Sequence, residues 1–296
     1  MYFIDIIKYM QSVFDCFSYF GSGGEDNLLL LRLTELAPHV TRFFIVEGSH
    51  SFQQTYMGGY KLPSLLKNDE RFSPFTDKIE FVPFEWYPHT NEAHQKNYLQ
   101  VAYEKYMRTN NISATNCVIH FSDLDEVPHA SIFSHITSTC GADKFYTLSG
   151  LFYVYHMNGV RYDKSNKPAL WHGGVIGRAD CIPSGGLVNW RDSRGRGGKY
   201  IIVPYSTSHF SYMGTTRQIM KKFREWGHAC ETHVRQFVSG GFMGLEEHVR
   251  AGHYYAGGGN RVIYKPLSYF AKHSTFVPKT LFSMVANGTF EIFTDS

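Results

Sequence analysis

The 296-residue sequence lacks the patterns that mark several common classes of protein. It contains no run of about 18 apolar residues, so we expect no transmembrane helix. Its five cysteines include no Cys-x-x-Cys pair, which argues against a structural zinc site. Neither the P-loop pattern nor the Rossmann glycine pattern occurs, and Gly257-Gly258-Gly259 is interpreted as a turn.

The sequence also lacks a strong charge of either sign. A net charge of +3 is too small for the footprint of a nucleic-acid-binding protein, although it is compatible with small anionic ligands. The odd number of widely spaced cysteines favours a reducing compartment. The first nine residues lack the basic start and cleavage site of a signal peptide, and they are interpreted as a docked terminal helix or strand. We therefore expect a soluble, cytoplasmic protein, although a lumenal chain trimmed of its membrane anchor would look the same.

Residues 13–128 alternate between strand patterns and helix patterns. Apolar runs predict strands at 13–19, 43–47, 78–82 and 117–121, and helices are predicted at 28–36 and 92–107. This alternation predicts an α/β fold, in which helices cover the faces of a mostly parallel sheet. In the second helix, the side chains expected to form the buried stripe are Tyr98, Val101, Ala102 and Tyr106.

The pattern changes after Pro128, where aromatic residues and glycines become frequent. Paired strands are predicted at 144–148 and 151–156, and a glycine-rich region follows at 171–198. Its basic part, 191–198, is interpreted either as a loop that closes over phosphates or as a solvated surface loop. A strand at 200–204 precedes helices at 215–226, 232–238 and 245–251, and the charges of the first helix, Lys222 included, are assigned mainly to its solvated face. No firm domain boundary is evident.

The most informative stretch is Cys117–Pro128, in which an apolar strand runs into three carboxylates. Asp123 and Asp125 are two residues apart, so in an extended turn they face the same way. Oxygen ligands of this kind suit Mg²⁺ or Mn²⁺ bound together with a phosphate. Ligands of open α/β sheets also bind beyond the carboxyl ends of the strands. The alternative is an ordinary acidic turn on the surface.

Several stretches together resemble glycosyltransferase family 17, whose best-known members are the bisecting N-acetylglucosaminyltransferases. The segment Ser122–Pro128 resembles the family's Ser-Asp-x-Asp-Glu-x-Pro, and Ser208–Gly214 is similar to its Trp-His-x-Ser-Tyr-x-Gly. The other similar segments follow the family's order and are Asp15-Cys16-Phe17, Glu25–Leu36, Phe44–Glu47, Arg71–Ile79, Gln95-Lys96-Asn97 and His228. The absence of an anchor fits a soluble relative better than the Golgi members.

This resemblance implies a fold of GT-A type, with a mixed, mostly parallel central sheet flanked by helices and a smaller C-terminal region on the acceptor side. One domain would span residues 1–296, with a nucleotide-sugar-binding half at 1–128 and an acceptor-side half at 129–296. The implied activity is inverting, metal-dependent transfer of a sugar from a UDP-sugar to a hydroxyl of a glycan or glycoprotein acceptor, which forms a β linkage. N-acetylglucosamine is the sugar implied by the family, and xylose or another hexose stays open.

The resemblance and the reaction together name candidate site residues. For Mn²⁺ or Mg²⁺ these are Asp123, Asp125 and His209, although a hydrogen-bonded core histidine is the alternative for His209. The nucleotide sugar is expected to contact Glu47, Gln95, Asn97, Asp123, Arg194 and Arg196. Inversion needs one general base, for which the candidates are Glu246, Glu247 and Glu231, followed by Asp192 and Asp163. Trp171 and Trp190 are candidates for stacking on sugar rings or for ordinary core packing.

Two other functions stay open at this point. A metal-dependent hydrolase of sugar nucleotides or phosphoesters would use the same carboxylates and would turn over the donor without an acceptor. An inactive relative would bind glycans through its aromatic side chains and carry out no chemistry.

Overall fold

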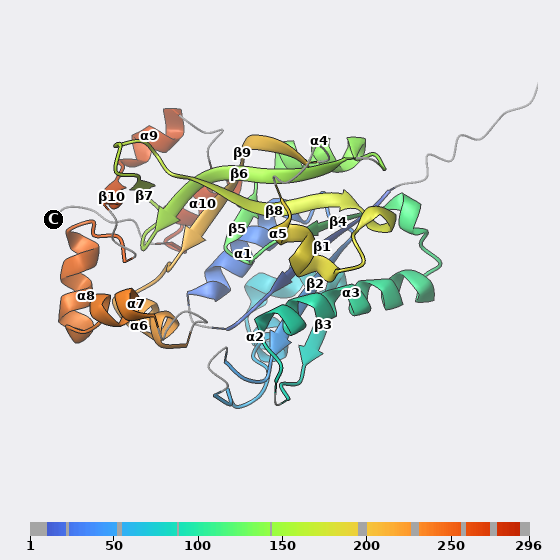
Figure 1. Cartoon of the computed structure of the whole chain (residues 1–296), viewed down its shortest axis with the longest axis horizontal. Helices are drawn as coiled ribbons and strands as arrows, with labels where there is room; N and C mark the ends of the chain where they lie inside the picture. The colour runs from blue at the N-terminus through green and yellow to red at the C-terminus, as the bar shows by residue number, and fades with distance from the viewer. Residues whose placement is uncertain are drawn as a thin grey trace, which may run out of the picture.

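The computed structural model describes residues 11–21, 24–51, 55–87, 89–142, 144–194, 200–225, 231–255, 259–272 and 277–290. A ten-stranded sheet runs through the molecule, and helices cover both of its faces (Figure 1). This arrangement confirms the predicted α/β class, with a mixed central sheet flanked by helices.

The first half of the chain forms the parallel part of the sheet. Strand β1 pairs with β2 on one side and β4 on the other, β3 pairs with β2, and all three pairs are parallel. The bounds of these strands are β1 (Ser12–Ser18), β2 (Arg42–Gly48), β3 (Ile79–Phe84) and β4 (Cys117–Phe121). Between them lie α1 (Glu25–Leu36), α2 (Leu62–Asn68), η1 (Glu70–Lys78), α3 (Glu92–Thr109) and η2 (Ala114–Asn116). The predicted alternation of strands and helices is therefore confirmed.

The second half extends the same sheet with mixed pairing. Strand β8 lies antiparallel to β4, β6 pairs with β7, β8 and β9, and short β5 pairs with β9. The strands are β5 (Glu126–Pro128), β6 (Phe145–Val154), β7 (Gly159–Tyr162), β8 (Leu170–Arg178), β9 (Tyr200–Ser211) and β10 (Arg261–Tyr264). The helices are α4 (Ala130–Thr139), η3 (Ala179–Cys181), α5 (Gly186–Asp192), α6 (Thr216–Glu225), α7 (Thr232–Phe237), α8 (Gly241–Arg250), α9 (Leu267–Lys272) and α10 (Lys279–Ala286).

One expectation for this half is wrong, and glycine is the reason. The predicted pair of strands at 144–148 and 151–156 is one strand, β6, and the glycine-rich region 171–198 contains β8 and α5. A Cβ on Gly150 would lie 1.5 Å from the Thr207 oxygen, and one on Gly174 would lie 2.4 Å from the His120 ring. Glycine inside these strands allows a close approach of neighbouring atoms rather than a turn.

The buried stripe of α3 also differs from the prediction. Its buried residues are Gln95, Lys96, Leu99, Tyr103 and Met107. Tyr98 and Val101, which were expected inside, are 42% and 53% exposed. The helix is therefore rotated so that two polar side chains at its start face inward.

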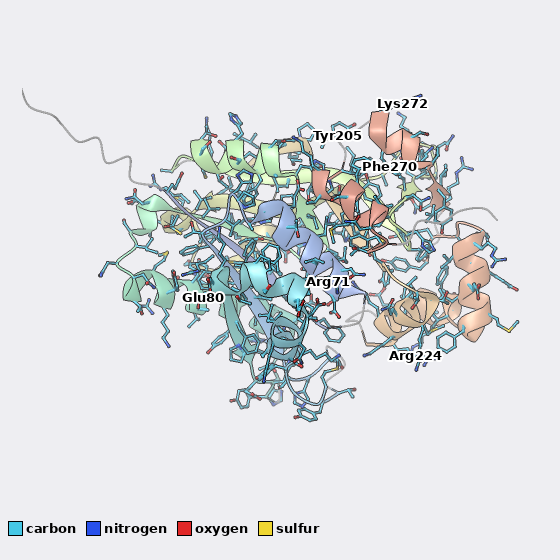
Figure 2. The ribbon with its side chains drawn as sticks, turned by 180° about the vertical axis from the view of Figure 1, so that it is seen from behind. Arg71, Glu80, Tyr205, Arg224, Phe270 and Lys272 are labelled. Carbon is cyan, nitrogen blue, oxygen red and sulfur yellow. The ribbon has the colours of Figure 1, made fainter. Side chains whose placement is uncertain are left out.

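The sheet separates two apolar cores. One lies against α1, α4 and α10, and the other lies against α3 and α5. A third cluster joins α6, α7 and α8, with Tyr212, Phe223 and Phe237 at its centre, and Figure 1 shows these helices grouped at one end of the molecule. In the view from behind, Arg224 of α6 projects outward from this group (Figure 2). No helix in the described ranges is long and apolar enough to cross a membrane.

Candidate active site

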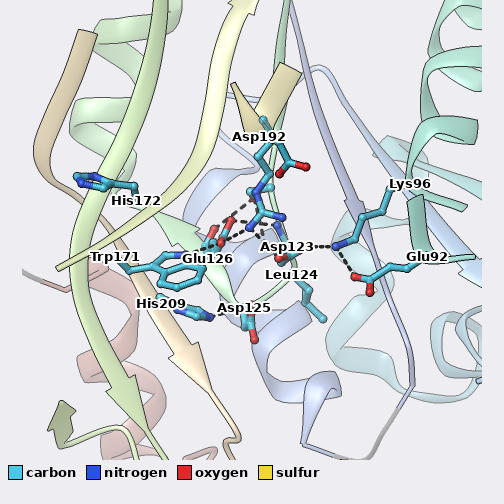
Figure 3. A network of polar contacts seen from close by, with 12 residues as sticks. Glu92, Lys96, Asp123, Leu124, Asp125, Glu126, Trp171, His172, Asp192 and His209 are labelled. Carbon is cyan, nitrogen blue, oxygen red and sulfur yellow. Dashed lines mark hydrogen bonds and ion pairs between the residues drawn. The ribbon is translucent and has the colours of Figure 1, made fainter. Parts of the chain in front are cut away.

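The acidic turn 122–125 lies where the sequence predicts it, directly after the carboxyl end of β4. The following strand β5 pairs antiparallel with β9, and this register places Glu126 opposite His209. Two stretches far apart in the sequence, each part of the resemblance, are thus side by side. Figure 3 shows Asp125 next to His209, with Asp123 on the side of α3.

A buried arginine fixes the main chain of this turn. Arg32 of α1 is fully buried, and its guanidinium donates to the carbonyl oxygens of Asp123 at 2.6 Å and of Leu124 and Glu126 at 3.4 Å. It also donates to the Ser122 hydroxyl at 2.8 Å. One side chain therefore holds carbonyl oxygens along the length of the turn.

The charge of Arg32 is balanced beneath the turn. Asp15 of β1 accepts two hydrogen bonds from the guanidinium, at 2.6 and 2.9 Å, and lies 2.7 Å from His120 Nδ1 on β4. Burial raises the pKa of Asp15, but Arg32 and His120 outweigh burial and hold it at about 2. Burial lowers the pKa of His120. Asp15 is thus ionised within a fully buried ion pair.

Asp123 is closely paired with two cations. Its carboxylate lies 2.6 Å from Lys96 Nζ of α3 and 2.8 Å from the Arg191 guanidinium of α5. Burial opposes ionisation, but Arg191 and Lys96 hold the pKa of Asp123 well below its usual range. Lys96 also pairs with Glu92 at 2.6 Å. The charge of Asp123 is therefore already compensated by the protein.

Glu126 is fully buried behind the turn and joins both sides of the site. It accepts hydrogen bonds from Trp171 Nε1 at 2.6 Å, from the Arg191 guanidinium at 2.5 Å and from the Asp123 amide at 3.1 Å. These three contacts fix the indole ring of Trp171 relative to the turn (Figure 3). Glu126 thus orders its neighbours and is not exposed to a ligand.

Asp125 has looser contacts than Asp123. Its oxygens lie 3.5 Å from His209 Nε2 and 3.4 Å from Lys222 Nζ of α6. Burial raises its pKa, but Lys222 and His209 lower it to about 2. Lys222 also lies 3.5 Å from Glu25. At neutral pH Asp125 is therefore an ionised carboxylate with no short ion pair among the described residues.

The imidazole of His209 is held between two aromatic rings. Its centroid lies 4.4 Å from that of Phe152 and 4.6 Å from that of Trp171. Its Nδ1 is buried and has no hydrogen-bond partner in the described part of the chain. Because Nε2 faces Asp125, the ring presents a nitrogen beside an oxygen, which is a donor pair suited to a divalent cation.

These groups line a cleft of about 530 Å³ at the carboxyl ends of β1 and β4. Six carboxylates face it, from Glu25, Glu92, Asp123, Asp125, Asp192 and Glu231. Four cations face it, from Lys96, Arg191, Arg194 and Lys222. With histidine neutral, the described lining residues therefore carry an excess of two negative charges.

The cleft brings together only part of the predicted site. Of the predicted residues it is lined by Asp123, Asp125, His209, Arg194, Glu231, Asp192 and Trp171. Arg196 and His228 lie outside the described residues. None of these assignments is tested by position alone, and each stays a prediction.

Three residues predicted to bind the nucleotide sugar lie away from the cleft, and two of them, Glu47 and Asn97, are engaged in the protein scaffold. The Glu47 carboxylate accepts the amides of Lys61 and Leu62 at 2.7 and 2.9 Å, and thereby caps α2. Asn97 accepts the Val188 amide at 2.9 Å and anchors α5. Gln95 is buried. Glu47, Gln95 and Asn97 are not among the described residues that line the cleft.

Several other candidates also lie away from the cleft in the described structure. Glu246 and Glu247 are exposed on α8, where Glu246 pairs with Arg250 at 3.3 Å. Asp163 accepts the amides of Ser165 and Lys167 in a surface turn. Trp190 is fully buried in the core, as the packing alternative requires. Their positions lend no support to a role in catalysis or sugar stacking.

Of the four cations that line the cleft among the described residues, only Arg194 was predicted from the sequence. Lys96 lies within a segment of the resemblance, but its role was not assigned, and Arg191 lies in a region interpreted as a loop. Lys222 was assigned to a solvated face, yet its side chain is only 17% exposed. A signal existed, because Lys222 follows Ile219 by three residues and so shares the inner face of α6.

The residues present fit a metal ion that is completed by substrate. No group of three or more His, Cys, Asp or Glu side chains in the described residues could hold an ion by itself. Asp125 and His209 nevertheless offer two adjacent donors to the cleft. Ions such as Mg²⁺ commonly bind through one or two protein ligands together with substrate phosphates. A diphosphate in the cleft would supply the remaining ligands.

Comparison with known proteins identifies the family. A search of curated proteins gives no match. Among solved structures, UDP-glucose pyrophosphorylase complexed with UDP-glucose is similar over 65% of this chain and 84% of that chain, with 12% identity and a TM-score of 0.34, a score too low to support an argument. The model of glycosyltransferase family 17 matches residues 5–166, which is more than half of the chain. The chain therefore belongs to glycosyltransferase family 17 and is a glycosyltransferase.

Proposed function

We propose that the protein transfers a sugar from a UDP-sugar to a hydroxyl of a glycan, with inversion and with a divalent cation held by Asp125 and His209. The observation that carries this proposal is that the loosely contacted carboxylate of Asp125 lies beside the imidazole of His209. The other aspartate of the turn, Asp123, is already neutralised by two cations.

The charge of the cleft supports the need for a cation. Its described lining residues have an excess of two negative charges, and a nucleotide diphosphate adds further negative charge. Without compensation the two would repel each other at short range. A divalent ion between Asp125 and the diphosphate offsets this repulsion and, when bound, stabilises the charge that develops on the leaving group.

The cationic side chains would serve the same leaving group. Lys96, Arg191 and Lys222 all line the cleft and are fixed by ion pairs with its carboxylates. Cations that are held in place before the reaction stabilise developing charge without reorganising. Asp123 orders Lys96 and Arg191, and its remaining lone pairs are proposed to contact the ribose.

Inversion places the base on the face of the sugar opposite to the diphosphate. The base takes the proton of the acceptor hydroxyl, the acceptor oxygen bonds to the anomeric carbon, and the bond between that carbon and the diphosphate breaks. Of the predicted bases, Glu231 and Asp192 line the cleft. An α-linked donor then gives a β-linked product and free UDP. N-acetylglucosamine is the donor sugar that the family favours, ahead of xylose and other hexoses.

The proposed single domain uses both halves of the chain at this site. Residues 1–128 supply β1, the acidic turn and Lys96, which fits their proposed role on the donor side. Residues 129–296, the proposed acceptor-side half, also supply His209, Arg191 and Lys222 to the cleft. Donor binding should therefore depend on both halves.

Calorimetry with a panel of nucleotides tests the proposal. UDP, UDP-N-acetylglucosamine, UDP-xylose, UDP-glucose and a GDP-sugar are titrated into the protein with Mn²⁺ and with EDTA. We expect binding of UDP compounds that depends on Mn²⁺ and is lost in Asp125→Asn. Binding that is equal with EDTA would contradict the metal site. Turnover of UDP-sugar at full rate without any acceptor would instead favour a hydrolase.

A further inference from the structure

A second cavity of about 830 Å³ adjoins the cleft, on the side of β6, β8 and β9. Trp171, Asp192 and Arg194 line both cavities. The remaining walls of the second cavity, which we call the side groove, are Thr147, Leu170, His172 and Ile202. A ligand in the side groove can therefore reach into the cleft past three shared side chains.

One of the residues that line the side groove has an unsatisfied hydroxyl. Thr147 is only 1% exposed, and its Oγ1 has no hydrogen-bond partner in the part of the chain that the structure describes. A buried hydroxyl without a partner is unfavourable. Because Thr147 is one of the residues that line the side groove, a ligand there that carries its own hydroxyl groups is a candidate partner for it.

The other walls suit a neutral ligand that has both apolar and polar faces. Leu170 is 46% exposed and Ile202 is 47% exposed, and exposed apolar side chains of this kind can cover the carbon faces of sugar rings. Asp192 and Arg194 carry opposite charges and lie 3.8 Å apart, so together they add no net charge. Among the described residues, the walls of the side groove therefore lack the cationic character that a phosphate or carboxylate ligand requires.

A rigid wall separates the side groove from the proposed metal ligands. The indole of Trp171 is held by the buried Glu126 at 2.6 Å, and its ring lies 4.6 Å from that of His209. Figure 3 shows Trp171 between His172 and His209, with Asp192 on the opposite side of the network. A ligand that rests against Trp171 from the side groove is thus close to the place where we put the donor sugar.

We propose that the side groove binds the acceptor as an uncharged oligosaccharide of at least two sugars, and that Asp192, the acid shared by both cavities, is the base. This inference rests on the proposed function. A cavity of this size suits a ligand of several rings rather than one. The carboxylate of Asp192 takes the proton of the acceptor hydroxyl as its oxygen bonds to the anomeric carbon and UDP leaves.

The binding part is tested on the whole chain with an array of printed neutral oligosaccharides. The variants are Thr147→Val, which keeps the shape and removes the hydroxyl, and Ile202→Ser. The matched control is Ile201→Ser, because Ile201 is the adjacent residue, is 39% exposed and does not line the groove. We expect labelling of particular glycans to weaken roughly 3–10-fold in Thr147→Val and at least 3-fold in Ile202→Ser, but not in the control.

UDP binding with Mn²⁺, measured by calorimetry on the same preparations, separates this inference from the proposed function. If UDP binds normally but no glycan is labelled, or all variants are labelled equally, the proposal that the side groove binds the acceptor is wrong. The proposed donor site is not affected by that result. Loss of UDP binding in the wild type would instead contradict the proposed function.

The catalytic part is tested with Asp192→Asn against Glu231→Gln. We expect Asp192→Asn to lower kcat by about 10²-fold or more, to leave glycan labelling and UDP binding in place, and to remove the acidic limb of the pH–kcat profile. Glu231→Gln should retain that limb. If the limb is lost in Glu231→Gln and kept in Asp192→Asn, Asp192 is not the base.

Discussion

The two aspartates of the acidic turn are two residues apart and have different surroundings. Asp123 lies 2.6 and 2.8 Å from two cations that come from α3 and α5. Asp125 lies 3.5 and 3.4 Å from His209 and Lys222. The first carboxylate is closely paired, whereas the second has room for another positive group.

This difference indicates a division of labour within one short motif. Ion pairs at 2.6–2.8 Å are charge-assisted hydrogen bonds and fix both partners, so Asp123 mainly orders Lys96 and Arg191. The contacts of Asp125 are too long for that role. Asp125, the carboxylate with the longer contacts to protein cations, is therefore the better candidate to bind a metal ion.

The largest effect is expected from Arg32→Met, which removes the frame that both aspartates share. Asp15 would be left as a buried charge with His120 as its remaining partner, and the carbonyl oxygens of the turn would lose their common donor. We expect the free energy of unfolding to fall by about 3–5 kcal/mol, measured by urea denaturation. Arg71→Met is the control, because the exposed Arg71–Asp69 pair should contribute less than about 1 kcal/mol. Equal stability of the two variants would contradict a supporting role for Arg32.

Asp125→Asn should have the larger effect on activity. The substitution keeps the size of the side chain and removes the charge that we assign to the ion. We expect transfer to fall by about 10²–10³-fold and UDP binding to lose its dependence on Mn²⁺, with little change in the unfolding curve. Retention of both the transfer rate and the dependence on Mn²⁺ would remove Asp125 from the site.

Asp123→Asn should affect stability more than Asp125→Asn does, and transfer activity less. Lys96 and Arg191 would each lose their pairing with Asp123, so we expect the free energy of unfolding to fall by about 1–3 kcal/mol. Binding of Mn²⁺ with UDP should persist, and transfer should fall less than in Asp125→Asn. If this variant loses the dependence on Mn²⁺ and keeps its stability, the roles of the two aspartates are reversed.

The smallest effect concerns pH and the buried ion pair beneath the turn. His120 has a lowered pKa in the folded state, so below about pH 6.5, the ordinary pKa of histidine, the unfolded chain binds more protons than the folded one. Stability should therefore decline as the pH falls from 7 to 5. Asp15, with a folded pKa of about 2, adds stability that is present above its ordinary pKa and is lost as the pH falls through about 2. Urea denaturation of the wild type and of His120→Gln from pH 5 to 7 measures the first effect, and the variant should show the shallower decline.

The sequence was sufficient for those parts of the site that are local in the chain. The strand before Asp123, the turn itself and its place at a sheet edge all follow from apolar runs and strand ends. The resemblance added His209, which β5 and β9 then place beside the turn. These features depend on short segments, where patterns are informative.

The counter-charges could not be predicted in the same way. Lys222 lies 97 residues from Asp125, and nothing in the local pattern specifies that α6 turns it inward to meet that carboxylate. Arg191 was missed because it begins the stretch 191–198, whose arginines and glycines favour a loop, whereas the structure places it in α5. Glu47 ends a strand at the expected edge, but its carboxylate is used to cap α2.

Strand β9 connects the two cavities along one stretch of main chain. It carries Ile202 in the side groove and His209 beside Asp125, and β6 supports it along its length. Between Val203 and Thr207 it contains two more residues than the facing part of β6, with Tyr205 at a φ of +53°. The strand is thus a spacer of fixed length, and a one-residue insertion would turn His209 to the opposite face. If the acceptor lies in the side groove, the hydroxyl that receives the sugar is selected by the length of a backbone segment, and changing the linkage position would require a change in strand length rather than a new side chain.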